Sequence, residues 1–236
     1  MRAREAAIGL RRLAAASLAA LACSAAPARA EVESRGVADF DEVVLEVAGD
    51  LRIEQGPREA LTLEAEPAVL RMITTEVRQR RLRIGLAPGR VETRQPIRMT
   101  LALRKIRSFE SRAAGAVSAG PLQAASLALT LGGGGSIRVA RVLAQTLEVR
   151  IAGAGDVAIG GGHVKAQRVV ITGIGGYVAP AMDSERAEVA IDGNGQARLA
   201  AAGTLDVRIG GVGQVHYRGE PALTQSIRGI GSVERD

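Results

Sequence analysis

Aromatic side chains are almost absent from this 236-residue chain: they make up 2% of the residues, and there is no tryptophan. Hydrophobic residues still reach 47%, so a core must be built from aliphatic side chains. Aromatic rings provide large amphipathic contact surfaces, and their scarcity argues against an aromatic platform for sugars. Sequence parity places the two tyrosines in the core. The aromatic residues are Phe40, Phe109, Tyr177 and Tyr217.

Cysteine and histidine are equally scarce. Cys23 is the only cysteine, which excludes an intramolecular disulfide framework. The histidines, His163 and His216, lie far apart in the sequence, one in an expected turn and one on an expected strand. No further ligand types cluster beside either of them. We therefore expect no metal site and no cofactor.

Charge of one sign is not concentrated beyond the first 30 residues, although the whole chain carries a formal net charge of +6. Residues 1–30 hold five arginines and one glutamate, and the remainder holds 26 basic and 24 acidic side chains. The densest basic run, residues 78–83, is interpreted as an exposed turn and strand face. Because nucleic-acid binding needs several clustered phosphate contacts, we expect no nucleic-acid partner.

Long apolar runs are missing except near the start. Residues 1–30 combine several arginines, an apolar stretch over residues 13–22 and small residues at Ala28 and Ala30, which is typical of a secretory signal peptide. The stretch is too short for a membrane-spanning helix. We predict cleavage after Ala30 and export to the periplasm or the cell surface. Lipidation at Cys23 is the less favoured alternative, because Ala20 stands where the lipid-attachment motif usually has leucine.

Glycine, by contrast, is abundant, with 29 residues, and much of it follows one pattern. An apolar residue is followed by two glycines separated by one residue, and then by a second apolar residue. The pattern recurs at a spacing of 20 and later 18 residues, which is typical of a solenoid. In the first copy, Ala113 takes the first glycine position. The copies cover residues 111–117, 131–137, 151–157, 171–177, 191–197, 209–215 and 227–233.

Apolar residues alternate with a period of two on both sides of each glycine pair, and the glycines keep the same parity. A period of two belongs to strands. The pattern predicts an all-β fold, a parallel β-solenoid of right-handed β-helix type with about seven Gly-x-Gly coils. Each coil consists of two short strands joined at a glycine bend. A less regular β segment precedes the coils and includes a short helix over Ala68–Ile73, opened by Pro67. Residues 31–236 form one domain.

The paired glycines are predicted to be structural, for one of two reasons. They adopt backbone angles closed to other residues, or they occupy inward positions too narrow for a side chain. These structural glycines are Gly115, Gly133, Gly135, Gly153, Gly155, Gly173, Gly175, Gly193, Gly195, Gly211, Gly213, Gly229 and Gly231.

The residue between the two glycines forms a column from coil to coil. Much of this column is apolar, and if it faces outward it is a flat candidate binding face. Because monomers rarely expose such stripes, we expect the N-terminal segment to cover it. The column begins with Ala114 and Gly134, and the candidate binding face within it consists of Ala154, Ile174, Asn194, Val212 and Ile230.

Charged residues also repeat at the coil spacing. Glu148, Arg168 and Glu188 are predicted to stack as a ladder of alternating charge. An exposed pair of this kind contributes ~0–1 kcal/mol, so the ladder supports the register more than the stability.

Carboxylates do not form a recognisable site. A calcium-binding solenoid needs an aspartate at a fixed position of each repeat, and only Asp156 follows a second glycine. A polysaccharide-cleaving enzyme needs two convergent carboxylates. The candidates are Asp183, Glu185, Asp192 and Asp206, whose spacing does not separate them from exposed turn and strand residues.

The tandem glycine pairs resemble the family of auto-transporter adhesin head GIN domains. The resemblance includes the opening at Phe40, Gly56 after the second strand, and the ending over residues 215–221. It covers about residues 37–234 and implies a secreted or envelope-associated β-solenoid. The family offers no catalytic residues to carry over. The adhesin label of the family is itself inferred from structural likeness. The label implies binding at a surface.

These observations favour an exported, non-catalytic protein that acts as an adhesin or a cell-envelope binding protein. The sequence does not identify the partner; a cell-surface glycan and an envelope protein are the two candidates. Two alternatives remain open: an envelope enzyme that processes polysaccharides, and a purely structural envelope protein.

Overall fold

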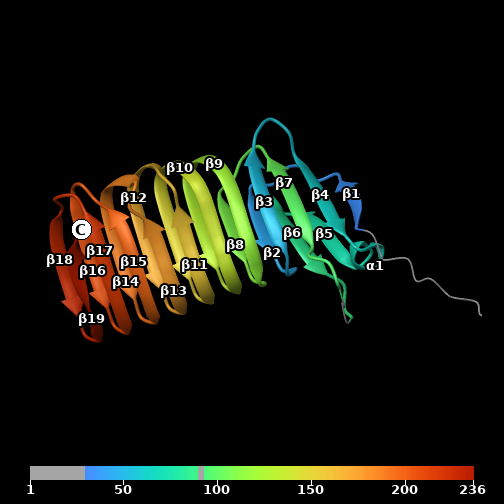
Figure 1. Cartoon of the computed structure of the whole chain (residues 1–236). Helices are drawn as coiled ribbons and strands as arrows, with labels where there is room; N and C mark the ends of the chain where they lie inside the picture. The colour runs from blue at the N-terminus through green and yellow to red at the C-terminus, as the bar shows by residue number, and fades with distance from the viewer. Residues whose placement is uncertain (1–29, 90–92) are drawn as a thin grey trace, which may run out of the picture.

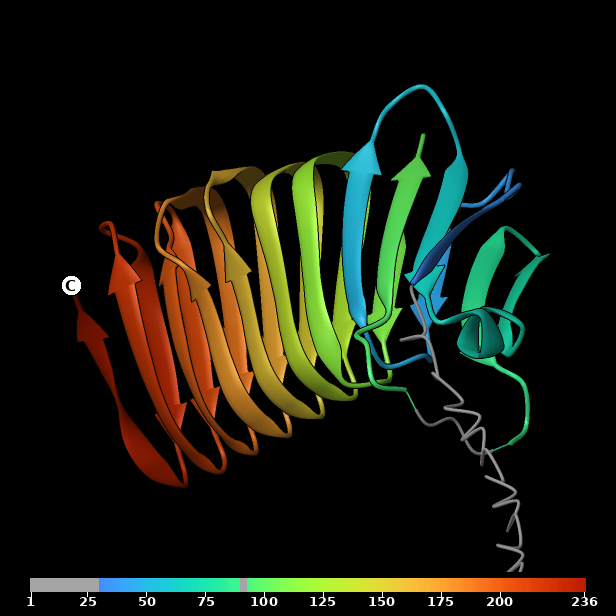
Figure 2. The same cartoon turned by 45° about the vertical axis from the view of Figure 1, so that its right-hand side comes forward.

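The computed structural model describes residues 30–89 and 93–236. Its strands lie side by side along one axis and form a β-solenoid, with the N-terminal strands and α1 at one end (Figures 1 and 2). The predicted all-β parallel solenoid is confirmed, with about six turns in place of seven. Residues 1–29 of the predicted signal peptide, including Cys23, lie outside the described residues.

Two long walls of parallel strands face each other. In each coil, the strand of the second wall comes before the glycine bend in the chain, and the strand of the first wall comes after it. The first wall contains β3 (Asp50–Gln55), the first parts of β9 (Gly115–Leu131) and β10 (Gly134–Ile151), β11 (Ala154–Ile159), β13 (Ile174–Ala179), β15 (Asn194–Ala200), β17 (Val212–Arg218) and β19 (Ile230–Arg235). The second wall contains β2 (Glu42–Leu45), β8 (Ser108–Ser111), the later parts of β9 and β10, β12 (Gly162–Ile171), β14 (Met182–Ile191), β16 (Thr204–Ile209) and β18 (Ala222–Ile227).

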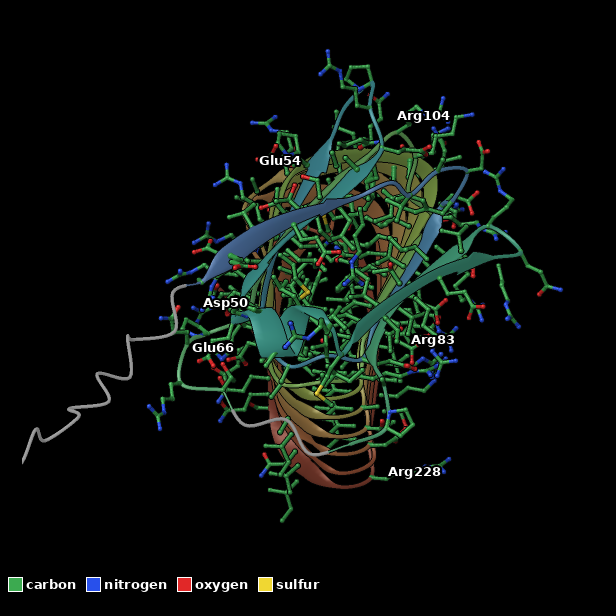
Figure 3. All side chains as sticks on the ribbon, turned by 90° about the vertical axis from the view of Figure 1, so that its right-hand side faces the viewer. Asp50, Glu54, Glu66, Arg83, Arg104 and Arg228 are labelled. Atoms are coloured by element: carbon green, nitrogen blue, oxygen red, sulfur yellow. The ribbon has the colours of Figure 1, made fainter. Side chains whose placement is uncertain are left out.

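Inward side chains of the two walls form one aliphatic core. Ile151, Ile171 and Ile191 stack directly upon one another through the parallel register, and each is fully buried. Every second residue on both sides of a bend is buried in the same way in all coils except the last, as the period of two predicted. Viewed from the N-terminal end, side chains fill the space between the walls, while the labelled charged residues Glu54 and Arg83 lie on the outside (Figure 3).

The N-terminal segment continues the stack, which the sequence did not reveal. Leu45 pairs with Ser111, and Leu51 pairs with Val117. Residues 45–51 therefore form one more bend beneath the first patterned copy, with Val47 and Gly49 in the two glycine positions. The repeat is hidden because residues 56–107 are inserted before the chain reaches the next coil.

The inserted residues close this end of the solenoid. On the first wall, β7 (Arg98–Leu103) pairs with β3, β4 (Ala60–Ala65) pairs antiparallel with β7, and β1 (Glu31–Arg35) pairs antiparallel with β4. On the second wall, β6 (Arg81–Leu86) pairs with β2, and β5 (Ile73–Arg78) pairs antiparallel with β6. The short helix α1 (Pro67–Leu70) buries Val69 and Leu70 against the core. It begins at proline, as predicted, but ends before Ile73, which starts β5.

Both explanations for the paired glycines hold, at different positions. At Gly153 an added Cβ would lie inside van der Waals distance of the carbonyl oxygen of Gly133, one coil below. Gly155 has φ +145°, and its Cβ would likewise meet the carbonyl of Gly135. In a later coil, a Cβ on Gly195 would lie 2.8 Å from the Ile171 side chain, which is the narrow inward position. The main obstacle is therefore the backbone of the coil below.

A buried polar network lies where the coil shortens from 20 to 18 residues. The Tyr177 hydroxyl donates to Gln167 Oε1 at 2.9 Å, and Gln167 Nε2 donates to Ser184 Oγ at 2.8 Å. The Ala200 carbonyl accepts from Ser184 Oγ at 2.7 Å and from Gln167 Nε2 at 3.1 Å. Ser184 and Gln167 thus satisfy a carbonyl that the shortened coil turns inward. Burial raises the pKa of Tyr177, so the hydroxyl remains a donor.

We predict that Gly155→Val lowers the free energy of unfolding by about 2 kcal/mol or more, because its Cβ would collide with the backbone of Gly135. Urea unfolding monitored by circular dichroism measures the change. The matched control is Ala154→Val: Ala154 is exposed, and Ile174 already occupies its column in the next coil. Equal stability of the two variants would contradict the stacking constraint.

We predict that Tyr177→Phe costs about 1–3 kcal/mol, because it leaves the buried Gln167 Oε1 without its donor. Tyr217→Phe serves as the control, since Tyr217 is only partly buried. The midpoint of thermal unfolding should fall for the first variant and stay near the wild-type value for the second. A similar midpoint in both variants would mean that the network adds no stability.

Candidate binding face

The column between the paired glycines lies on the first wall. Gly134 pairs with Ala154, Ala154 with Ile174, and Ile174 with Asn194. Val212 and Ile230 continue the series in the next two coils. Each residue follows the bend directly, where the strand begins and its side chain alternates away from the core. The residues Ala154, Ile174, Asn194, Val212 and Ile230 are called the apolar stripe below.

The apolar stripe is exposed, so the expectation that the N-terminal segment covers it was wrong. Ile174 is 63% exposed and Ile230 is 73% exposed. Residues 56–107 close the end of the solenoid instead of folding back over the first wall (Figure 2). Strand pairing explains this position, because an edge strand satisfies its backbone groups only by adding to the sheet.

The surface beside the apolar stripe carries scattered charges: Asp192 and Arg228 lie in the column before the first glycine, and both are exposed. The neighbouring column after the second glycine contains one charged residue, Asp156. Four residues after Ile174, on the same outward side of β13, Val178 is 44% exposed and extends the apolar area. Val178 was not among the residues identified from the sequence. The signal available in the sequence was the period of two, which places Val178 on the same side of β13 as Ile174.

The second wall carries the predicted charge ladder. Glu148 pairs in register with Arg168, and Arg168 with Glu188. Arg168 and Arg208 each donate to one oxygen of Glu188 at 2.8 Å, so its carboxylate is fully engaged. Glu148 instead pairs with Arg150 at 2.9 Å. A shallow groove of about 520 Å³ runs beside the ladder and includes Thr146, Arg186 and Thr204 in its lining.

The basic run over residues 78–83 is neutralised by ion pairs. Arg80 pairs with Asp41 at 2.8 Å, and Arg81 with Glu42 at 2.7 Å. Arg83 Nε donates to Glu46 Oε2 at 2.6 Å. This run therefore does not present an array of unpaired cations to a polyanion.

Glu46 links three elements of the N-terminal region. Arg83 from β6 binds one of its oxygens, and Arg112 from the first glycine bend binds the other at 2.8 Å. The hydrogen bond from Arg83 is the largest cause that holds the pKa of Glu46 below its ordinary value. The pKa of Glu59 is also lowered: burial raises it, but the hydrogen bonds from Arg104 and from the Asp39 backbone, together with nearby arginine charge, outweigh the burial. A general acid needs the opposite shift.

Two of the carboxylates considered for catalysis share one strand, and the other two lie on different elements. Asp183 and Glu185 are exposed on β14, and Asp192 is exposed at the following bend. Asp206 lies on β16 and accepts from Arg208 at 3.1 Å. His163 is exposed on β12, while His216 Nδ1 lies 3.3 Å from Asp236 Oδ1. Over residues 30–89 and 93–236, no three His, Cys, Asp or Glu side chains are grouped so that they could hold a metal ion.

A family model described as "putative auto-transporter adhesin, head GIN domain" matches residues 39–221. No curated protein matches this sequence. In the part of the chain that the structure describes, no helix is long and apolar enough to cross a membrane.

Solved structures share the fold at low sequence identity. A "putative adhesin" from Bacteroides fragilis has a TM-score of 0.84 at 19% identity, over 88% of this chain and 97% of that chain. A "putative adhesin" from Parabacteroides distasonis has a TM-score of 0.70 at 20% identity, over 89% and 98%. A "putative lipid binding protein" from the same species has a TM-score of 0.65 at 18% identity, over 89% and 98%. At these identities the likeness shows the fold alone.

We predict that Glu46→Gln lowers the free energy of unfolding at pH 7 by about 0.5–1 kcal/mol, because it weakens two ion pairs at the partly exposed carboxylate. The folded-state pKa of Glu46 is lowered, so its stabilising effect is present above the unfolded pKa and is lost as the pH falls through the folded pKa. Urea unfolding at pH 7 and pH 3 should show that the difference from wild type narrows in acid. The control is Glu185→Gln, on an exposed strand position. If the difference in the free energy of unfolding between Glu46→Gln and wild type stayed constant with pH, the role of the Glu46 charge would be contradicted.

Proposed function

Because the chain belongs to the auto-transporter adhesin head GIN domain family, we propose that it is an exported, non-catalytic binding protein of the cell envelope that holds its partner on the apolar stripe. The exposure of Ile174, Val212 and Ile230 on one wall carries the proposal. Asn194 is the one polar side chain in the stripe, between Ile174 and Val212. Exposed apolar patches on soluble proteins mark interaction sites. The partner that fits this face is an envelope protein with its own apolar surface.

The rigidity of the wall supports this role. Each stripe residue lies on a strand that is hydrogen-bonded to the coil below, so the side chains are held ~4.8 Å apart before any partner arrives. A preorganised face loses little conformational entropy on binding. The face also lacks aromatic residues, which favours an apolar protein partner over a glycan.

Two further features support the proposal. The sequence of residues 1–30 is typical of a signal peptide, which agrees with export. Arginine hydrogen bonds lower the pKa values of Glu46 and Glu59 and occupy both oxygens of Glu188. Carboxylates held in this way suit a structural role and not proton transfer, so they give the polysaccharide-processing alternative no support.

We predict that residues 31–236 bind isolated bacterial cell envelopes, and that Ile174→Asp combined with Val212→Asp reduces this binding at least tenfold. In the complex, the side chains of Ile174 and Val212 would be buried against the partner. The two substitutions would instead remove carboxylates from water without compensation. Retention on envelopes, before and after protease treatment of the envelope surface, is the measurement. Loss of retention after the protease treatment would identify a protein partner.

The matched control is Leu143→Asp, an exposed aliphatic residue on β10 away from the stripe. All variants should keep the wild-type melting temperature. The proposal fails if the stripe variant is retained as well as wild type. A purely structural role is favoured if wild type itself is not retained, and release of reducing sugar from the envelopes would point to an enzyme.

A further inference from the structure

The two ends of the stack differ in how their edge strands are protected. At the N-terminal end, antiparallel strands close both walls, and their edges carry charges: β1 contains Glu31, Glu33 and Arg35. β5 contains Glu76 and Arg78. Charged side chains are a common device that stops an edge strand from pairing with another chain.

The last coil has none of this protection on its second wall. β18 reads Ala-Leu-Thr-Gln-Ser-Ile, six residues without a charge or a proline. Over residues 30–89 and 93–236, β18 pairs only with β16 and β19 only with β17. A regular, uncharged edge of this kind is a template for a further strand.

The inward row of this coil is also exposed. Leu223 and Ile227 are 37% and 40% exposed, whereas their partners one coil below, Leu205 and Ile209, are each 1% exposed. Gln225 stands above the buried Val207. The unpaired edge of β18 therefore lies at the end of the molecule where the inward row of the apolar core is exposed.

We propose that a second copy of this chain covers this end, with β18 pairing antiparallel to β18 of the partner about a two-fold axis at Gln225. Directly opposed residues of antiparallel strands point to the same face. Centring on Gln225 therefore opposes Leu223 to Ile227 in the core row and Thr224 to Ser226 on the outer face. Aliphatic pairs and Thr–Ser pairs are favourable across strands, and a two-fold contact requires this self-complementarity.

The proposed dimer can be tested by placing like charges opposite each other across the two-fold axis. We expect residues 31–236 to sediment as a dimer at micromolar concentrations. Gln225→Glu places two carboxylates opposite each other at pH 7, which should raise the dimer dissociation constant about fivefold or more. At pH 3.5 the carboxylates are protonated, so the variant should return to the wild-type dissociation constant measured at that pH.

Two variants complete the experiment, which is read by sedimentation velocity with circular dichroism as the folding check. Thr224→Lys combined with Ser226→Lys opposes two lysine pairs and should give a monomer at every concentration. Gln196→Glu makes the same chemical change as Gln225→Glu on an exposed position of β15 and should leave the dimer unchanged. A monomeric wild type overturns the proposal. So does a dimer that Gln225→Glu and Gln196→Glu affect equally, or one that the stripe variant dissociates instead.

Discussion

The close stacking of glycine upon glycine is the constraint on which the rest of the structure depends. At each bend, the Cα of one coil lies against the carbonyl of the coil below, and Gly133, Gly153 and Gly173 repeat this contact in series. A side chain there would push the coils apart and break the parallel register on both walls. Because the register is kept, the aliphatic columns remain aligned, and a core with almost no aromatic residues is buried in every coil but the last.

The repeated part of the fold could be predicted because the repeat gives the position of each bend, and the strand period gives the direction of each side chain. Gly153, Gly155 and the alternating residues around them place each bend and show which side chains turn inward. The bend at Val47 and Gly49 could not be predicted, since its partner coil begins only after residues 56–107. The strands β1 and β5 were missed as well, because each is defined by the strand on which it docks and not by an alternation of its own.

The columns of the binding face followed from the period, but their exposure did not. Whether Ile174 meets solvent depends on where residues 31–110 pack, and that is decided by unpaired backbone groups at the end of the solenoid. The buried network around Gln167 was also invisible in the sequence. The network supplies hydrogen-bond donors to the Ala200 carbonyl in the shortened coil. A single buried glutamine at an inward position is not repeated from coil to coil, so it gives no periodic signal.

The hydrogen bonds that join the coils run along the axis of the stack, while the peptide chain crosses that axis once per turn. A tensile load applied along the axis would open the bonds of one coil after another and release the chain in increments of 18 to 20 residues. A load applied across the axis would shear both walls at once and meet much greater resistance. The direction of a pulling force would therefore decide whether this fold yields gradually or holds.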